Sequence, residues 1–332
     1  MKIIKIILCV YIISLINTTN VFAEDFESWI ISFKSYAIKK GISKNTLDET
    51  MSNVKFLPKV IEYDRYQPEF YEDTKTYISK RTSNDKLKKG IKLFNKNNVF
   101  ILDIESKFDV EKELLLSLMG IETNFGTYLG KMDILSSLAT LSFDKRRSEF
   151  FTKELITILK LIDSGTIDKN ILYGSWAGAF GNFQFMPSTI KKYAIDYNND
   201  NFIDLKSTED SFASAANYIK RLGWKKDKPC FYRVKLRENI PIKFLNTSAK
   251  KIKNKKKLKD FEKYIINYDN IKINENLVVG IITPDREIVE NSKLLEPAYL
   301  TFNNYELILK WNRSLRFALA VCTLKDKFKN EL

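Results

Sequence analysis

Glycine is scarce in this chain and is concentrated in one stretch, and this constrains the fold more than any other feature of the sequence. Seven of the eleven glycines fall between Leu114 and Pro187, a segment that begins LLLSLMGIETNFG and ends GSWAGAFGNFQFMP. Glycine lets the backbone adopt positive φ or approach another group closely, at a cost in chain entropy. The glycines are grouped around one acidic residue, Glu122. We therefore expect the functional site around Glu122.

The first residues have the pattern of a secretory signal peptide. Two lysines within residues 1–5 precede an apolar run, Ile6–Ile16, and a small-residue cleavage site ends at Ala23. The apolar run is shorter than the ~20 residues that a membrane-spanning helix needs. A bulky leucine precedes Cys9, where lipid attachment would require a small residue. We expect cleavage after Ala23, export to the periplasm and no lipid anchor.

The composition limits the chemistry that the protein can perform. The chain has no histidine, which excludes Ser-His-Asp and Cys-His catalysis and His-ligated zinc. Any catalysis then rests on carboxylates, hydroxyls, Lys, Tyr or a hard metal, and no organic cofactor is expected. The net charge of +14 favours polyanionic partners, and export argues against nucleic acid. Cys230 and Cys322 can form one disulfide, but the sequence leaves their pairing open.

Apolar periodicity predicts helices up to Glu122. Residues from Phe26 to about Asn98 read as helical, with Ser43 as a helix cap. Asp109 is the expected N-cap of a helix over Val110–Gly120. In that helix the leucines and Met119 form an apolar face, and Glu122 extends it.

A carboxylate on an apolar face is poorly solvated and can hold a proton, as a general acid must. The alternative is a buried structural Glu122 paired with Arg146 or Arg147, and spacing alone leaves this open. The GSWAGAFGNFQFMP segment alternates small residues with aromatics and neutral hydrogen-bonding groups, which suits a sugar-binding wall. A tight glycine turn buried between helices is the alternative for that segment.

An EF-hand-like loop predicts structural calcium. Oxygen side chains stand at its first, third and fifth positions, a carbonyl at the seventh, and Asn201 where Gly is usual. Ser207 occupies the twelfth position instead of Glu, and a carboxylate at the fifteenth position could replace it. A metal-free turn is the alternative. The expected ligands are Asp196, Asn198, Asp200, Phe202 and Asp210.

After Trp224 the sequence changes to alternating, strand-like patterns at Phe231–Arg237, Leu277–Thr283 and Tyr299–Phe302. Between the strands lies Lys250–Lys259, with seven lysines in ten residues, which reads as a solvated insertion. Residues from Asn303 to about Lys327 read as one helix. The expected organisation is a signal peptide (1–23), an N-terminal helical domain (24–100), a catalytic core with the metal loop (101–224), a small β subdomain (225–300) and a closing helix (301–332).

Several segments, in register along the chain, resemble the lytic murein transglycosylase B family, the goose-lysozyme-like enzymes that cleave bacterial cell-wall glycan. The matching texts are DRYQPEF (Asp64–Phe70), GIETNFG (Gly120–Gly126), GKMDILSSLATLSFD (Gly130–Asp144), GSWAGAFGNFQFMPST (Gly174–Thr189), DYNNDNFIDL with SAANYIKRLGW (Asp196–Trp224) and NNYELILKWNRS (Asn303–Ser314). The lysine-rich β region has no clear counterpart, and Trp311 and Phe317 stand where tyrosines are expected.

The resemblance implies a mainly α fold (α+β), with a lysozyme-like helical core, an N-terminal helical domain and a small inserted β subdomain. It makes Glu122 the single catalytic carboxylate, which protonates the oxygen between N-acetylmuramic acid and N-acetylglucosamine. The muramoyl C6 hydroxyl then closes on C1 as a 1,6-anhydro ring, whereas ordinary glycosidases use two carboxyl groups. The alternatives are a hydrolase, in which Asp133 or Asp144 activates water, and a non-catalytic wall-binding protein.

The same resemblance implies the remaining site residues and partners. It places Ser175, Gln184, Tyr218 and Asn312 in the sugar subsites. Arg146 and Arg147 are candidates for contacts with peptide or lactyl carboxylates. It also supports the calcium loop, because the family carries Asp at the fifteenth position. Peptidoglycan strands are the expected partner, other cell-wall enzymes are further candidates, and we expect a monomer.

Overall fold

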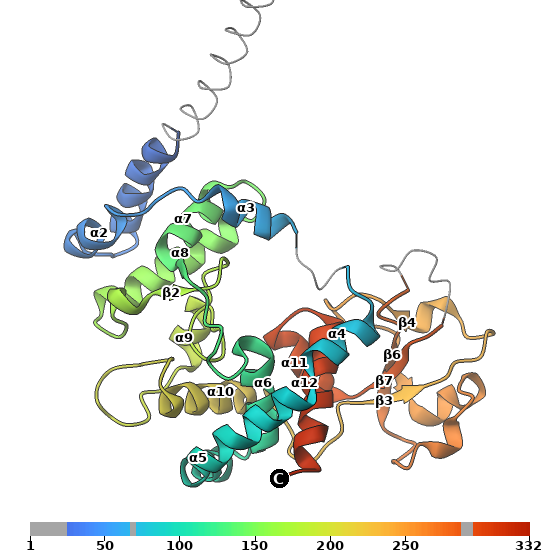
Figure 1. Ribbon diagram of the computed structural model, residues 1–332. Coiled ribbons are helices and arrows are strands. Elements are labelled where there is room, and N and C mark those ends of the chain that lie inside the picture. The colour runs from blue at the N-terminus through green and yellow to red at the C-terminus, as the bar shows by residue number, and fades with distance from the viewer. Residues whose placement is uncertain (1–24, 67–70, 287–294) are drawn as a thin grey trace, which may run out of the picture. The chain divides into compact units, whose positions relative to one another are not determined.

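The computed structural model describes residues 25–66, 71–286 and 295–332, so the expected signal peptide and Gln67–Phe70 lie outside the described residues. Figure 1 shows a mainly helical chain with small sheets, as predicted. The chain divides into two compact units. Unit 1 comprises residues up to Tyr66, Leu129–Lys192 and Asn199–Asp204, and unit 2 the rest. The units are interleaved in sequence, and the division expected at residues 100, 224 and 300 stays a prediction.

Unit 1 is built from helices around a short two-stranded sheet. A helix covers residues 25–39. The other elements are α2 (Lys44–Met51), α3 (Pro58–Arg65), β1 (Met132–Asp133), α7 (Ile134–Phe143), α8 (Ser148–Asp163), η2 (Lys169–Ile171), β2 (Tyr173–Gly174) and α9 (Pro187–Tyr193), whose last residue belongs to unit 2. Ser43 caps α2 by accepting from the Thr46 N–H, which confirms its predicted role.

The helical part of unit 2 contains α4 (Thr74–Arg81), α5 (Asn84–Phe108), α6 (Lys112–Thr123), α10 (Thr208–Leu222), α11 (Asn303–Trp311) and α12 (Leu315–Lys329). Two predictions were wrong here. Asp109 does not start a helix, because its left-handed φ of 53° ends α5 and Glu111 is the N-cap of α6. The closing segment is not one helix, because Asn312 adopts an extended conformation that ends α11 before Ser314 caps α12.

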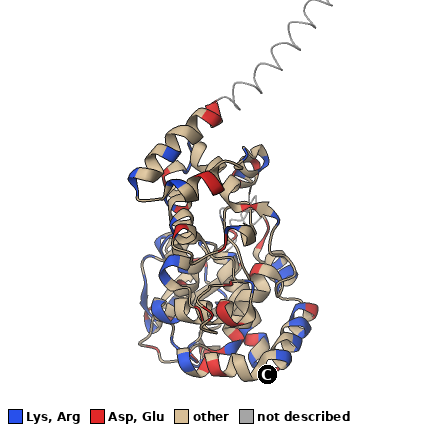
Figure 2. Cartoon of the chain, turned by 90° about the vertical axis from the view of Figure 1, so that its left-hand side faces the viewer, with Lys and Arg blue, Asp and Glu red and all other residues tan. Residues whose placement is uncertain are grey.

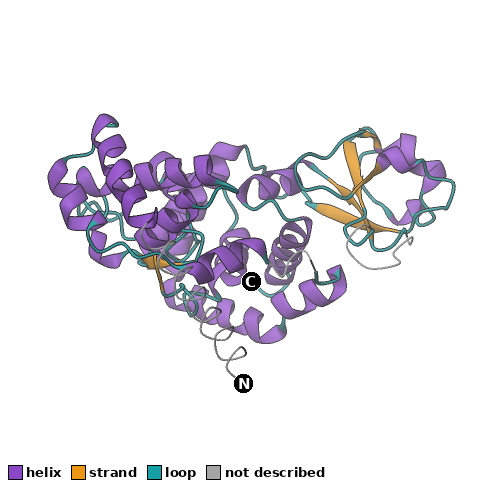
Figure 3. Cartoon of the chain, turned by 90° about the horizontal axis from the view of Figure 1, so that it is seen from above, coloured by secondary structure: helices purple, strands orange, loops and turns teal. Residues whose placement is uncertain are grey.

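The strands of unit 2 form a single sheet, which Figure 3 draws in orange. Its strands run in the order β3 (Phe231–Val234), β7 (Ala298–Thr301), β6 (Val278–Ile282), β4 (Leu245–Asn246), and β5 (Lys256–Lys257) also pairs with β6. Short 3₁₀ helices accompany it: η3 (Ile242–Phe244), η4 (Leu258–Tyr264) and η5 (Tyr268–Asn270). Strand side chains and Phe261 share one hydrophobic core, so this β region has its own packing. The three strand predictions are confirmed to within a few residues.

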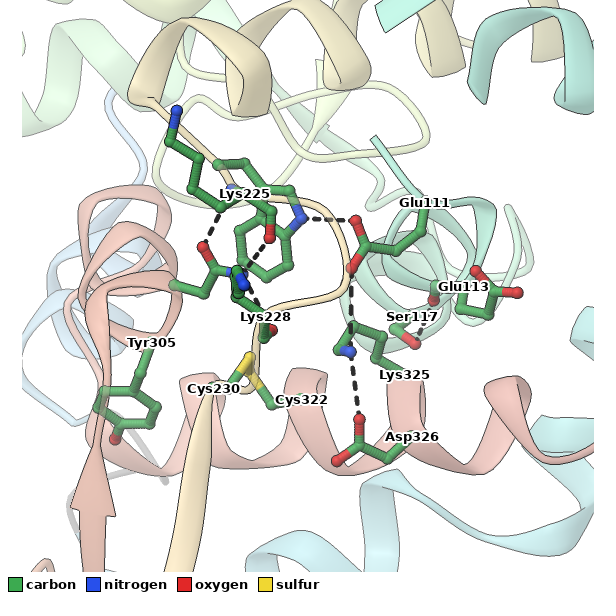
Figure 4. Close-up of a disulfide and its surroundings, with 12 residues drawn as sticks. Glu111, Glu113, Ser117, Lys225, Lys228, Cys230, Tyr305, Cys322, Lys325 and Asp326 are labelled. Atoms are coloured by element: carbon green, nitrogen blue, oxygen red, sulfur yellow. Dashed lines mark hydrogen bonds and ion pairs between the residues drawn. A yellow bond between two sulfur atoms is a disulfide. The ribbon is translucent and has the colours of Figure 1, made fainter. Parts of the chain in front are cut away.

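A disulfide joins the sheet to the helical part of unit 2. Cys230, just before β3, is bonded to Cys322 on α12, which settles the pairing that the sequence left open. Figure 4 shows a buried polar cluster beside it. There Glu111 accepts a hydrogen bond from the Trp224 indole N–H at 2.6 Å, and burial raises the pKa of the Glu111 carboxyl. The disulfide and this cluster fix α12 at the start of α6.

Candidate active site

The helix that carries Glu122 is buried along most of its length and ends directly after this residue. Residues Leu114 to Gly120 of α6 are buried, and α6 packs on α12. Asn124, Phe125 and Gly126 then have φ of 50°, 59° and 77°, three left-handed residues in succession that turn the chain sharply. Glu122 is half-buried at this turn. The local sequence therefore presents a carboxylate at the open end of an otherwise buried helix.

Trp311 orients the Glu122 carboxyl. Its indole N–H donates to Glu122 Oε1 at 3.0 Å. The Trp311 ring stacks on Tyr218, with centroids 5.0 Å apart, and Tyr218 stacks on Tyr193 at 4.3 Å. Burial, with a smaller contribution from Tyr193, raises the pKa of Tyr218 to about 12, so its hydroxyl stays protonated at neutral pH. The tryptophan in place of an expected tyrosine thus still supplies a hydrogen-bond donor to the carboxylate.

Glu122 lines a cavity of about 370 Å³ together with a group of lysines from α4 and α5. Lys86 is half-buried there, and its ammonium donates to the Gly120 carbonyl, two residues before Glu122. Burial, with smaller contributions from Arg81 and Lys89, lowers the pKa of Lys86 to about 8. Sequence reasoning missed Lys86, because nothing in the pattern of α5 distinguishes it from its neighbouring lysines.

In unit 1 the glycine-aromatic run forms a close-packed turn. A Cβ on Gly130 would lie 2.1 Å from the Gly174 carbonyl oxygen, so only glycine permits this approach of backbone to backbone. Gln184 has φ of 49°, and its amide donates to the carbonyls of Leu129 at 3.2 Å and Gly181 at 3.0 Å. Ser175 Oγ accepts from the Ala179 N–H at 3.0 Å. Both proposed sugar-binding side chains are thus held in fixed orientations by the turn.

Arg146 and Arg147 both bind Asp64 in unit 1. Arg146 Nε donates to Asp64 Oδ2 at 2.6 Å, and Arg147 Nη2 contacts Asp64 Oδ1. The Asp64 side chain is 1% exposed, whereas the two arginine side chains are 44% and 38% exposed. The buried carboxylate therefore anchors the guanidinium groups while part of each stays accessible. Within unit 1, Asp64 is the carboxylate that both arginines contact.

Each of the two aspartates considered as the residue that activates water in a hydrolase has a structural partner. Asp133 caps α7 by accepting from the Ser136 N–H at 2.6 Å. Asp144 accepts from Arg65 Nη2 at 2.8 Å. Each carboxylate holds an element of unit 1 in place.

Some of the expected calcium ligands belong to unit 1 and the others belong to unit 2. Among the described residues, no group of three or more His, Cys, Asp or Glu side chains is placed to hold a metal ion. In unit 1 the Phe202 N–H donates to Asp200 Oδ1 at 2.9 Å, and Asn201 has φ of 69°, the left-handed conformation predicted for it. In unit 2 the buried Asp210 accepts from the Tyr197 N–H at 2.8 Å. The conformation of Asn201 agrees with the expectation for its position in the loop, and calcium binding stays a proposal.

Tyr218 and Asn312 lie in the same unit as Glu122. Tyr218 contacts the Lys310 carbonyl through its hydroxyl at 3.3 Å. Asn312 is half-buried and is the C-cap of α11, next to Trp311 in sequence.

None of the helices in the described part of the chain is both long and apolar enough to cross a membrane.

A helical core that ends in one oriented glutamate defines this chain as a lysozyme-like protein. Residues 25–326 match the family model described as the transglycosylase SLT domain, and the chain belongs to this family. The membrane-bound lytic murein transglycosylase B of Escherichia coli K12 is 34% identical over 198 residues, which cover 57% of this chain. The matched part spans only 55% of that relative's length.

Two solved structures agree with this fold. SltB3 from Pseudomonas aeruginosa, in complex with NAG-NAM-pentapeptide, is 29% identical with a TM-score of 0.80, covering 92% of this chain and 79% of that one. The lytic transglycosylase Slt35 of Escherichia coli, in complex with calcium, is 26% identical with a TM-score of 0.76, covering 91% and 93%. The lysozyme-like fold expected from the sequence is confirmed.

Proposed function

We propose that this protein is a lytic transglycosylase that cleaves the β-1,4 bond between N-acetylmuramic acid and N-acetylglucosamine in peptidoglycan. The observation that carries the proposal is Glu122, half-buried at the end of α6 and oriented by the Trp311 N–H at 3.0 Å. Family membership supports it. SltB3 of Pseudomonas aeruginosa, a structural relative, has also been solved with NAG-anhNAM-pentapeptide, a ligand that contains an anhydro sugar.

In the proposed mechanism Glu122 acts first as an acid and then as a base. The protonated carboxyl gives its proton to the glycosidic oxygen as the bond from that oxygen to the muramoyl C1 breaks. The resulting carboxylate takes the proton of the C6 hydroxyl, whose oxygen bonds to C1 and closes the 1,6-anhydro ring. No water is consumed, and the proton on Glu122 is restored. One carboxyl group therefore suffices, in contrast to the pairs that ordinary glycosidases use.

We place the sugar contacts on Tyr218 and Asn312 in unit 2 and on Ser175 and Gln184 in unit 1. Arg146 and Arg147 would meet the peptide or lactyl carboxylates with the donors that Asp64 leaves exposed. Export to the periplasm, with cleavage after Ala23, places the protein where its substrate is. N-terminal sequencing of the secreted protein tests the cleavage point.

Calcium is a proposed structural ion of the loop from Asp196 to Asp210. The left-handed Asn201 and the buried Asp210 support this, and carboxylate, amide and carbonyl oxygens are the ligands that calcium prefers. When bound, the ion would neutralise the carboxylates and rigidify the loop. Thermal unfolding with calcium and with a chelator tests this, and an Asp200→Ala variant should lose any calcium-dependent increase in Tm.

Digestion of purified sacculi tests the reaction itself. We expect products that end in 1,6-anhydromuramic acid, detected by mass analysis. Reducing ends without the anhydro sugar would indicate a hydrolase instead. The Glu122→Gln variant should lose at least ~10²-fold in lysis rate, the contribution typical of a general acid-base group. Lysis at the wild-type rate by this variant would overturn the assignment of Glu122, and binding without any turnover by the wild type would indicate a wall-binding protein.

A further inference from the structure

The positive charge of the chain is concentrated in the β region of unit 2. Residues 231–275 contain thirteen Lys and Arg against five Asp and Glu, a net charge of +8 out of the +14 of the chain. The remaining 287 residues contain forty-two against thirty-six, a net of +6. Elsewhere Lys and Arg are interspersed with Asp and Glu over helices and loops (Figure 2). A lysine-rich composition spread evenly along the chain does not explain this local excess.

The cations of this region line a groove. A cavity of about 720 Å³ lies among Arg237, Lys256, Lys259 and Lys263, and Tyr264 completes its wall. These residues come from β5, from η4 and from the segment after β3. The Arg237 N–H donates to the Tyr264 carbonyl at 2.9 Å, and the buried Leu258 and Phe261 hold η4 on the core of the sheet. The backbone of the groove is therefore fixed by the fold.

The four cations have no carboxylate partner in the part of the chain that the structure describes. Neighbouring Lys255 does pair, with Glu306 at 2.7 Å. Lys263 instead lies over the Tyr264 ring at 5.1 Å, and Lys256 lies over Phe244 at 5.3 Å. In these contacts the ammonium groups lie over aromatic rings, which attract a cation without neutralising its charge. A groove in which the cations outnumber the carboxylates by four to two, on a fixed backbone, is suited to anionic groups.

The groove also contains two carboxylates, which narrow the class of ligand. Asp260 and Glu262 line it beside the cations. They would repel a ligand with closely spaced phosphates, such as nucleic acid or an anionic lipid surface. A peptide that carries separate carboxylates, with or without an amino group, matches the mixed charges better.

We propose that this groove is a second peptidoglycan-binding site, which takes the acidic peptide stems of the wall. The inference rests on the proposed function, which makes peptide-bearing glycan the substrate. The groove shares no lining residue with the cavity of Glu122. A second contact on the same polymer raises the effective substrate concentration without a change in the chemistry. Binding to intact wall therefore depends on the groove, and turnover of a short soluble fragment does not.

The test is sedimentation with sacculi in a Glu122→Gln background, so that binding is measured without lysis. The groove variant is Lys256→Gln, Lys259→Gln, Lys263→Gln. The matched control is Lys88→Gln, Lys92→Gln, Lys96→Gln, three exposed lysines of α5 outside both cavities, with the same loss of charge. We expect about ten-fold weaker binding for the groove variant and less than about two-fold for the control. Equal losses in the two variants would overturn the proposal, since only net charge would then matter.

Three further ligands identify the class that the groove binds: sacculi stripped of peptide stems by an amidase, anionic phospholipid vesicles, and duplex DNA. We expect the difference between the groove variant and the control to vanish on stripped glycan. A difference that persists there, or that is larger on vesicles or DNA, would contradict the peptide stem as ligand.

The two proposals can fail separately. With Glu122 intact, the groove variant should cleave a short soluble muropeptide dimer at the wild-type rate. If it does so and still binds sacculi normally, the second site is wrong and the proposed function stands. If Glu122→Gln lyses sacculi, the assignment of the active site is wrong whatever the groove does.

Discussion

Unit 2 contains two candidate binding regions that are built in opposite ways. Around Glu122 two charged groups are half-buried and held by specific neighbours, Glu122 by Trp311 and Lys86 by the Gly120 carbonyl. In the groove beside η4, four cations have no carboxylate partner among the described residues. Fixed, partly desolvated groups can act on one bond, whereas exposed charges attract a polymer and are screened by salt. We therefore expect the reaction at Glu122 and the attraction of the polymer at the groove, two separate regions of unit 2.

The largest expected effect comes from the disulfide that links these regions. Cys230 leads into the sheet and Cys322 lies on α12, which packs on the helix of Glu122. The bridge spans a sequence separation of 92, and closing a loop of about that length stabilises the folded state by about 4 to 5 kcal/mol in the chain-entropy model.

The Cys230→Ser, Cys322→Ser variant should therefore unfold at a clearly lower urea concentration. Equilibrium urea unfolding measures the difference, and reduction of the wild type should reproduce it. Turnover of a soluble fragment at low temperature should change little, because neither cysteine lines the cavity of Glu122. An unchanged urea midpoint would show that the two regions are held together without the bridge.

The second-largest effect is expected when Glu122 loses its hydrogen-bond donor. Trp311→Phe keeps an aromatic ring to stack on Tyr218 and removes the N–H that donates to Glu122. A hydrogen bond to a charged group contributes about 1.5 to 3 kcal/mol, so turnover should fall roughly ten- to a hundred-fold. Because the proposed first role of Glu122 is that of an acid, the alkaline limb of the pH-rate profile should move to higher pH when the carboxylate loses this donor.

Trp311→Tyr is the matched control, because a tyrosine hydroxyl can restore the donor. It should recover part of the rate and of the pH profile, while binding to sacculi stays the same in both variants. If Trp311→Phe kept the wild-type rate and pH profile, Trp311 would have no role in the proposed mechanism.

These regions also show what the sequence could and could not reveal. The glycines and the apolar helix face indicated Glu122 as the candidate residue, and alternating residue patterns predicted the strands. Both kinds of pattern are local in the sequence. The split of the closing helix at Asn312 and the reversal at Asp109 depend on tertiary packing that no local pattern records. The contact of Trp311 with Glu122 joins residues 189 positions apart. The groove likewise depends on the contact between the Arg237 N–H and the Tyr264 carbonyl, which lie in different segments. Contacts between residues that are far apart in the sequence can be identified only from the folded structure.

The smallest expected effect concerns Lys86, which is half-buried in the cavity of Glu122, whereas the cations of the groove are exposed. The pKa of Lys86 is lowered from 10.5 to about 8, chiefly by burial. Between these values the unfolded chain binds more protons than the folded one, so the free energy of unfolding should rise with pH. Lys86→Met should remove this contribution, which we place at ~1 kcal/mol or less because the group is only half-buried. Urea unfolding of the wild type and the variant at about pH 7 and about pH 9.5 measures the two slopes. Lys88→Met, on the exposed side of α5, should keep the wild-type slope, and identical slopes in all three proteins would show that Lys86 is as well solvated as the lysines of the groove.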